Sequence, residues 1–182
     1  MKTDLHKALQ NKEISGMIDA FGLEVKDGKV IVDESKLRYG KIIITADGDV
    51  DGSHIRILFL TFIWKFCPEL ITKGYIYAAV PPLYKVIQGT KFKYLKDDNA
   101  LEQFRKSNGS KKFELNRFKG LGEMDYQEMA ETVMNPETRT LKRITMEDAE
   151  KVAKTFISLM GEAVEPRKKF ISENSQRANI DI

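Results

Sequence analysis

The sequence predicts an α/β fold, in which a parallel sheet with flanking helices is followed by a smaller α+β C-terminal segment. Residues 42–45 are a short β-branched run, which is typical of a buried strand. Apolar residues then recur at helical spacing over 55–66, and 75–80 is a second short apolar run. A strand, a helix and a strand at this spacing predict a right-handed parallel unit.

The residues before this unit predict helix, a turn and one short strand. Residues 4–21 have the pattern of a helix in two pieces, with Asn11 capping the second piece and Gly22 ending it. Residues 26–29 are a turn signal, and 30–32 predict a short strand after the turn. Asp33 is expected to cap a brief helix over 34–39.

The residues after the unit predict a second domain. Pro81 and Pro82 end the second strand stiffly and mark a boundary, which gives predicted domains at 1–82 and 83–182. Residues 83–87 and 91–95 predict a hairpin, and a short helix through Lys106 follows. A strand near 113–115, a basic loop at 116–124 and a helix over 127–134 come next. A long helix from Thr145 and a charged helix over 165–174 complete the prediction.

The composition is that of a globular protein, and its overall charge alone does not indicate DNA binding. The 182 residues are 42% hydrophobic and 31% charged, which is ordinary for a globular protein, and no apolar run approaches membrane-spanning length. The net charge is only +3, so any affinity for DNA must come from local basic patches. Cys67 is the one cysteine, which excludes an internal disulfide and fits a reducing cytoplasm. We expect this thiol to be buried and inert.

Three aspartates, Asp47, Asp49 and Asp51, follow the first strand at alternate positions. Carboxylates this close repel one another, and a hard divalent cation such as Mg²⁺ relieves the repulsion. A helix–loop–helix calcium site is excluded, because its twelfth position needs a glutamate and here holds Leu58. Two alternatives stay open on the residues alone: a solvated acidic turn, and a phosphatase-like enzyme with Asp47 as nucleophile.

The basic loop at 116–124 is the second candidate site. Arg117 and Lys119 could contact phosphates, and the glycines of the loop allow a close approach of its backbone. The alternative is a solvated loop that packs through Phe118 and Leu121. His54, beside the acidic residues, is a group that supports the metal ligands, a phosphate contact or a structural histidine. Lys85 could reach DNA, and the alternative is an ordinary solvated surface lysine.

Three segments carry a resemblance to a known family. ADGDVDGSHIR at 46–56, PPLYK at 81–85 and NRFKGLGEM at 116–124 resemble the B subunits of type IIA DNA topoisomerases, which include DNA gyrase and topoisomerase IV. The resemblance implies a Toprim-like, Rossmann-like fold in which the acidic segment is the DxD motif. It assigns Asp47 and Asp49 to the Mg²⁺-binding pair and Asp51 to a position near a second metal. Arg117, Lys119, His54 and Lys85 are our candidate DNA contacts on the residues themselves, and the resemblance marks 116–124 as a family segment.

The same resemblance implies a function and partners. The chain would support cleavage and religation of both DNA strands by a tyrosine of the A subunit, within a heterotetramer that also needs the rest of the B subunit. ATP would bind only in an N-terminal domain that this sequence lacks. An alternative function is a noncatalytic module that docks the A subunit and DNA.

Departures from the family pattern limit these expectations. The family's EGDSA segment, whose Glu is metal ligand and general acid/base, is not in this sequence, and neither is PLRGK. Phe118 stands where the family usually has Tyr, and Gly48 where it usually has Ala. We therefore expect a C-terminal piece of a B subunit, either truncated or one product of a split gene. Alone, it is expected to bind Mg²⁺ weakly and to cleave no DNA.

Overall fold

The computed structural model describes residues 4–47, 49–161 and 163–177, and these form two compact units. The first unit holds the described residues within 4–42, 57–75 and 144–177. The second holds those within 43–56 and 76–143. The long helix α3 (Val50–Phe66) begins in the second unit and ends in the first.

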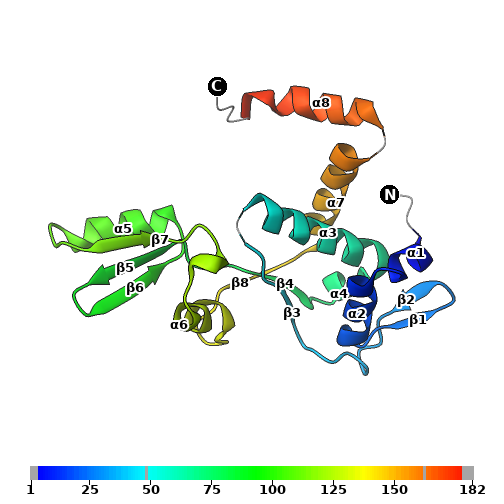
Figure 1. The fold of residues 1–182 in the computed structure, drawn as a ribbon, viewed down its shortest axis with the longest axis horizontal. Coiled ribbons are helices and arrows are strands. Elements are labelled where there is room, and N and C mark those ends of the chain that lie inside the picture. Colours follow the sequence, from blue (N-terminus) through cyan, green and yellow to red (C-terminus); the bar gives the residue numbers. More distant parts are fainter. Residues whose placement is uncertain (1–3, 48, 162, 178–182) are drawn as a thin grey trace. The chain divides into compact units, whose positions relative to one another are not determined.

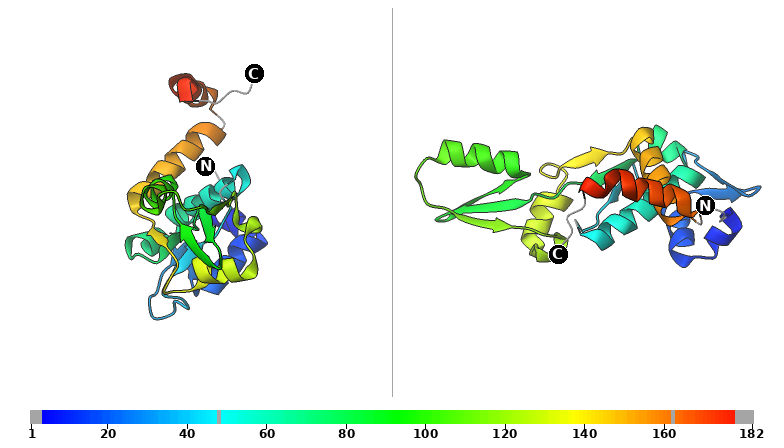
Figure 2. Two further views of the ribbon diagram at one scale, coloured as in Figure 1. Left: turned by 90° about the vertical axis from the view of Figure 1, so that its left-hand side faces the viewer. Right: turned by 90° about the horizontal axis from the view of Figure 1, so that it is seen from above.

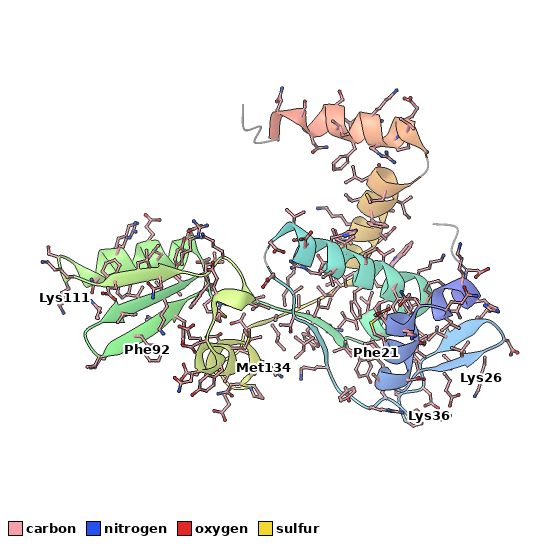
Figure 3. All side chains as sticks on the ribbon, in the orientation of Figure 1. Phe21, Lys26, Lys36, Phe92, Lys111 and Met134 are labelled. Carbon is pink, nitrogen blue, oxygen red and sulfur yellow. The ribbon has the colours of Figure 1, made fainter. Side chains whose placement is uncertain are left out.

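The first unit is mainly helical and has a small β-hairpin (Figure 1). Besides the end of α3, its elements are α1 (Leu5–Leu9), α2 (Lys12–Phe21), β1 (Glu24–Lys26), β2 (Lys29–Ile31), α4 (Glu69–Thr72), α7 (Met146–Met160), α8 (Val164–Asn174) and the 3₁₀ turn η3 (Ser175–Arg177). Phe21 of α2, labelled in Figure 3, packs edge-on against Phe59 of α3 with ring centroids 6.4 Å apart. Cys67 is buried, and this burial raises the pKa of its thiol to about 12, as expected for an inert cysteine.

Local hydrogen bonds confirm the predicted caps of α2 and correct the predicted helix over 34–39. The Asn11 side chain accepts from the N–H groups of Glu13 and Ile14, and Gly22 ends α2 at a φ of 78°. The predicted helix over 34–39 is wrong, because these residues form turns and irregular backbone. The Asp33 carboxylate accepts from the N–H and the hydroxyl of Ser35, which favours a turn over a helix. Strand β1, which pairs antiparallel with β2, was not predicted.

The second unit holds two three-stranded sheets, apart from Ile42, the first residue of β3, which belongs to the first unit. One has the order β3-β4-β8, from β3 (Ile42–Ile44), β4 (Ile76–Ala79) and β8 (Leu141–Arg143). The α/β fold is confirmed, with α3 and α4 in the connection between the neighbouring strands β3 and β4. Because β8 pairs antiparallel with β4, the sheet is mixed and not purely parallel as predicted.

The second sheet has the order β6-β5-β7 and carries helix α5 (Asp98–Asn108) on one face (Figure 2). It consists of the predicted hairpin β5 (Tyr84–Gln88) and β6 (Lys91–Leu95) with β7 (Glu114–Arg117) along β5. Its core holds Tyr84, Val86, Leu95 and Leu101. The 3₁₀ turn η1 (Leu121–Glu123), α6 (Tyr126–Met129) and the π-helical segment η2 (Ala130–Met134) follow β7. No helix in the described part of the chain is long and apolar enough to cross a membrane.

Candidate metal and DNA site

The acidic segment leaves the end of β3 and runs into α3, entirely within the second unit. The three isoleucines of β3 are each half-buried, so the strand gives the segment a packed base. Asp47 is half-buried, whereas Asp49 and Asp51 are exposed. Gly48, the glycine that stands where the family usually has alanine, lies outside the described residues.

Helix α3 begins at Val50, before the apolar residues over 55–66 that predicted it. The Asp49 side chain accepts from the N–H of Gly52 at 2.7 Å, and its carbonyl accepts from Ser53 at 3.0 Å. Asp49 therefore caps the helix, and Asp51 lies in its first turn. A carboxylate offers about four acceptor sites, so capping occupies only part of Asp49 and leaves acceptor capacity for a cation.

Gly52 allows the helix to start against the backbone of Asp47. A methyl group at Gly52 would lie 2.3 Å from the carbonyl oxygen of Asp47 and 2.8 Å from its nitrogen. Both contacts are far inside van der Waals range, so no side chain fits at this position. The segment is thereby folded back on itself, with the start of the helix beside Asp47.

The Asp47 carboxylate also contacts the basic loop, from which it is separated by 74 residues in sequence. Its Oδ1 accepts from the backbone N–H of Leu121 at 2.5 Å. A methyl group at Gly120 would lie 3.0 Å from this oxygen and 3.1 Å from Cγ. The two candidate sites of the sequence thus meet in the structure, through backbone atoms of the basic loop.

The basic loop is fixed at both of its ends. Phe118 is buried, and its N–H donates to the carbonyl of Leu83 at 2.9 Å. The Glu123 carboxylate accepts from the N–H of Lys119 at 2.7 Å and closes the turn. Arg117 and Lys119 are exposed, and the Arg117 guanidinium lies 5.9 Å from the centre of the Tyr84 ring. Phe118 therefore anchors the loop while both basic side chains face solvent.

The other two predicted DNA contacts have different surroundings. His54 is exposed in the first half of α3, close in sequence to the acidic residues. Lys85 on β5 is only 18% exposed, and its Nζ donates to Oε1 of Glu128 at 2.6 Å. Glu128 is itself buried and belongs to the capping box at the start of α6. This ion pair uses one of the three N–H donors of Lys85 and holds its side chain against α6.

The donor set of the acidic segment fits Mg²⁺ better than a cation that needs a complete protein cage. Among the described residues, no group of three or more histidine, cysteine, aspartate or glutamate side chains is arranged to hold a metal. Mg²⁺ usually retains several waters and takes only one or two carboxylates from the protein, with phosphate oxygens as further ligands. Asp47 and Asp49 supply carboxylates of this kind.

Two features of the site were missed from the sequence. The N–H of Leu121 is a backbone donor, and no pattern of side chains marks it as a partner of Asp47. The sequence does mark Glu128 as a capping-box residue, because it lies three residues after the helix cap Asp125. Its ion pair with Lys85 is not marked, because this pair depends on the tertiary fold.

Comparison with protein families divides the chain into three consecutive matches. Residues 4–81 match the Toprim domain, 82–107 match "GyrB, hook", and 110–172 match "DNA gyrase B subunit, carboxyl terminus". The acidic segment lies in the first match and the basic loop in the third. The β5–β6 hairpin and most of α5 lie in the second, and we refer to the sheet β6-β5-β7 with α5 as the hook sheet.

Curated relatives match over the whole chain. The sequence is 46% identical to the DNA gyrase B subunit of Thermus thermophilus over 182 residues, which is all of this chain and 29% of that protein. It is 44% identical to the same gyrase subunit of Treponema denticola over 186 aligned positions and 45% identical to that of Mycoplasma genitalium over 182. The chain spans less than a third of the length of these relatives. With three family segments in order and this identity throughout, the chain belongs to the type IIA topoisomerase B subunits.

Proposed function

We propose that the chain provides magnesium-binding residues of an ATP-dependent type II DNA topoisomerase. Asp47 and Asp49 are the proposed carboxylate ligands, and Asp51 is a further acidic group near them. The contact between Asp47 and Leu121 supports this proposal best, because it joins the acidic segment to the basic loop. A cation at Asp47 and phosphate contacts from Arg117 and Lys119 could then act on one DNA backbone.

The residues of the chain have separate tasks in this proposal. When bound, Mg²⁺ supplies positive charge that stabilises a phosphate oxygen during strand cleavage and religation. Asp47 and Asp49 hold the ion, while Arg117, Lys119 and His54 orient the DNA backbone. The attacking tyrosine is expected from the A subunit. ATP binding and the remaining metal ligand are expected from segments of the B subunit outside this sequence.

The proposed assembly is a heterotetramer of A and B subunits on DNA in the cytoplasm. The family membership supports these partners, and the identity to gyrase subunits favours the A subunit of a gyrase as the partner. The buried, unpaired Cys67 is compatible with a reducing compartment.

The test is Asp47→Asn in the reconstituted holoenzyme. This change keeps the shape of the side chain and an acceptor for Leu121 but removes the charge that binds a cation. We expect DNA cleavage to fall by about 100-fold, the size of effect seen when one charge-stabilising group is removed from an active site. Asp19→Asn, on the exposed surface of α2, is the matched control and should leave cleavage unchanged.

The second candidate function is a noncatalytic module that docks the A subunit and DNA. The hydrogen bonds that Asp47 accepts from the N–H of Leu121 and Asp49 from the N–H of Gly52 favour this alternative, because they give both carboxylates a structural role without a metal. In this case Asp47→Asn would leave cleavage intact. If the variant no longer co-sediments with the A subunit, Asp47 acts in assembly and not in metal chemistry.

A further inference from the structure

The Gly120–Leu121 turn holds one oxygen of Asp47 and packs against its carboxyl group. The N–H of Leu121 lies 2.5 Å from Oδ1, and a methyl group at Gly120 would come within 3.0 Å of Oδ1 and 3.3 Å of Oδ2. A methyl group at residue 120 would therefore press against the Asp47 carboxylate, which would have to move by a few tenths of an ångström. Its φ of −163° is extended backbone that any residue adopts, so the close approach of the Asp47 carboxylate, and not backbone strain, favours glycine here.

We propose that Gly120 and Leu121 are positioning residues for Asp47, and that docking of this turn is coupled to Mg²⁺ binding. The inference rests on the proposed function, because it assumes that Asp47 is a metal ligand. Ligating carboxylates are commonly held by hydrogen bonds from neighbouring groups, which fix the side chain before the ion arrives. With Oδ1 held by Leu121, the carboxylate retains acceptor capacity for the cation, mainly on Oδ2.

The turn can orient Asp47 because it is itself anchored. On one side, buried Phe118 bonds to the backbone of Leu83 beside the hook sheet. On the other side, Glu123 accepts from the N–H of Lys119 and closes the turn over Gly120. Lys119, a proposed phosphate contact, is adjacent to Gly120 in sequence, so the same anchoring sets the cation ligand and the phosphate contact together.

Coupling of this kind is reciprocal. If the docked turn raises the affinity of Asp47 for Mg²⁺, then bound Mg²⁺ must stabilise the docked turn by the same free energy. The hydrogen bond from Leu121 to Asp47 should therefore open less often when Mg²⁺ is present. Amide hydrogen exchange at Leu121 measures this opening directly and does not depend on DNA cleavage.

The experiment compares Gly120→Ala with Gly122→Ala in the reconstituted holoenzyme. A methyl group at Gly122 meets nothing within 4 Å, so this variant is the matched control in the same turn. We expect Gly120→Ala to weaken Mg²⁺ binding by about 10-fold in calorimetric titration, and Gly122→Ala to leave it unchanged. We also expect faster exchange of the Leu121 amide in Gly120→Ala, and slower exchange with added Mg²⁺ in the wild type.

The outcomes separate this inference from the proposed function. If the wild type binds Mg²⁺ and Gly120→Ala binds it equally well, the positioning role is wrong and the proposed function stands. If the wild type binds no Mg²⁺, the proposed function fails and the coupling fails with it. Should Gly120→Ala not fold, the wild type still decides: unchanged Leu121 exchange at saturating Mg²⁺ would overturn the coupling.

Discussion

The hook sheet and the acidic segment are held together in opposite ways. In the hook sheet, side chains fill the space between α5 and the strands, with Val86 and Leu101 buried and the rings of Phe104 and Phe113 packed edge-on at 5.2 Å. At the acidic segment, the close contacts depend on positions that lack a side chain. Gly52 lies against the backbone of Asp47, and Gly120 lies against its carboxylate.

This difference indicates which substitutions each region tolerates. The hook sheet should be sensitive to lost volume, because a cavity forfeits the packing contacts around it. The acidic segment should be sensitive to added volume, because a single methyl group meets the backbone or the carboxylate of Asp47. The following predictions test the contrast, from the largest expected effect to the smallest.

Leu101→Ala should destabilise the hook sheet most. Leu101 is 7% exposed and packs in the core of this sheet, so truncation should cost about 2–5 kcal/mol in free energy of unfolding. Urea denaturation measures the loss. Glu102→Ala, on the next residue of α5, removes only an exposed ion pair with Lys106 and should change stability by less than about 0.5 kcal/mol. Equal effects of the two variants would contradict packing of α5 on the strands.

Gly52→Ala should destabilise the acidic segment by about 3 kcal/mol, because its methyl group overlaps the Asp47 carbonyl oxygen at 2.3 Å. Gly16→Ala makes the same chemical change inside α2, where nothing lies within 4 Å. It should stabilise the chain by about 0.5–1 kcal/mol, because alanine favours a helix over glycine. The midpoint temperature of thermal unfolding should therefore fall for Gly52→Ala and rise for Gly16→Ala. A Gly52→Ala variant as stable as wild type would show that the segment can relax.

The same contrast explains which parts of the structure the sequence predicted. Helix starts were predictable at Asn11 and Thr145, because each side chain caps its own helix through local hydrogen bonds. Strand β8 was missed because two of its three residues, Lys142 and Arg143, are charged, and it forms only by pairing with β4. Local signals thus predicted elements that are stabilised locally.

At the site, the sequence predicted the chemical types of the residues but not their contacts. The alternating aspartates and the basic loop were identified as two candidate sites. Their meeting at Asp47 and Leu121 could not be predicted, because it joins a side chain to a backbone N–H across 74 residues. Lys85 shows the same limit, since its pairing with Glu128 becomes visible only in the fold.

Lys85→Met should cost about 2 kcal/mol in stability, because it leaves the largely buried Glu128 carboxylate without its ion-pair partner. Lys119→Met removes an exposed lysine and should change stability by less than about 0.5 kcal/mol.

The salt dependence of DNA binding then separates structural from phosphate-contacting lysines. A phosphate contact contributes about 1 to the slope of log K against log salt. We expect the slope to fall for Lys119→Met and not for Lys85→Met, and the reverse result would make Lys85 the DNA contact.

Asp49 combines a helix cap with a proposed metal ligand, and two substitutions separate these roles. Asp49→Ala removes the bond to the Gly52 N–H and should cost about 1 kcal/mol of stability. Asp49→Asn keeps an acceptor of similar capping strength, so its stability should stay within a few tenths of a kcal/mol (~0.3) of wild type. Both variants lose the carboxylate charge, so both should weaken Mg²⁺ binding in the reconstituted holoenzyme. If Asp49→Asn binds Mg²⁺ as well as the wild type, Asp49 serves only as the cap of α3, and Asp47 remains as the carboxylate ligand that the basic loop positions.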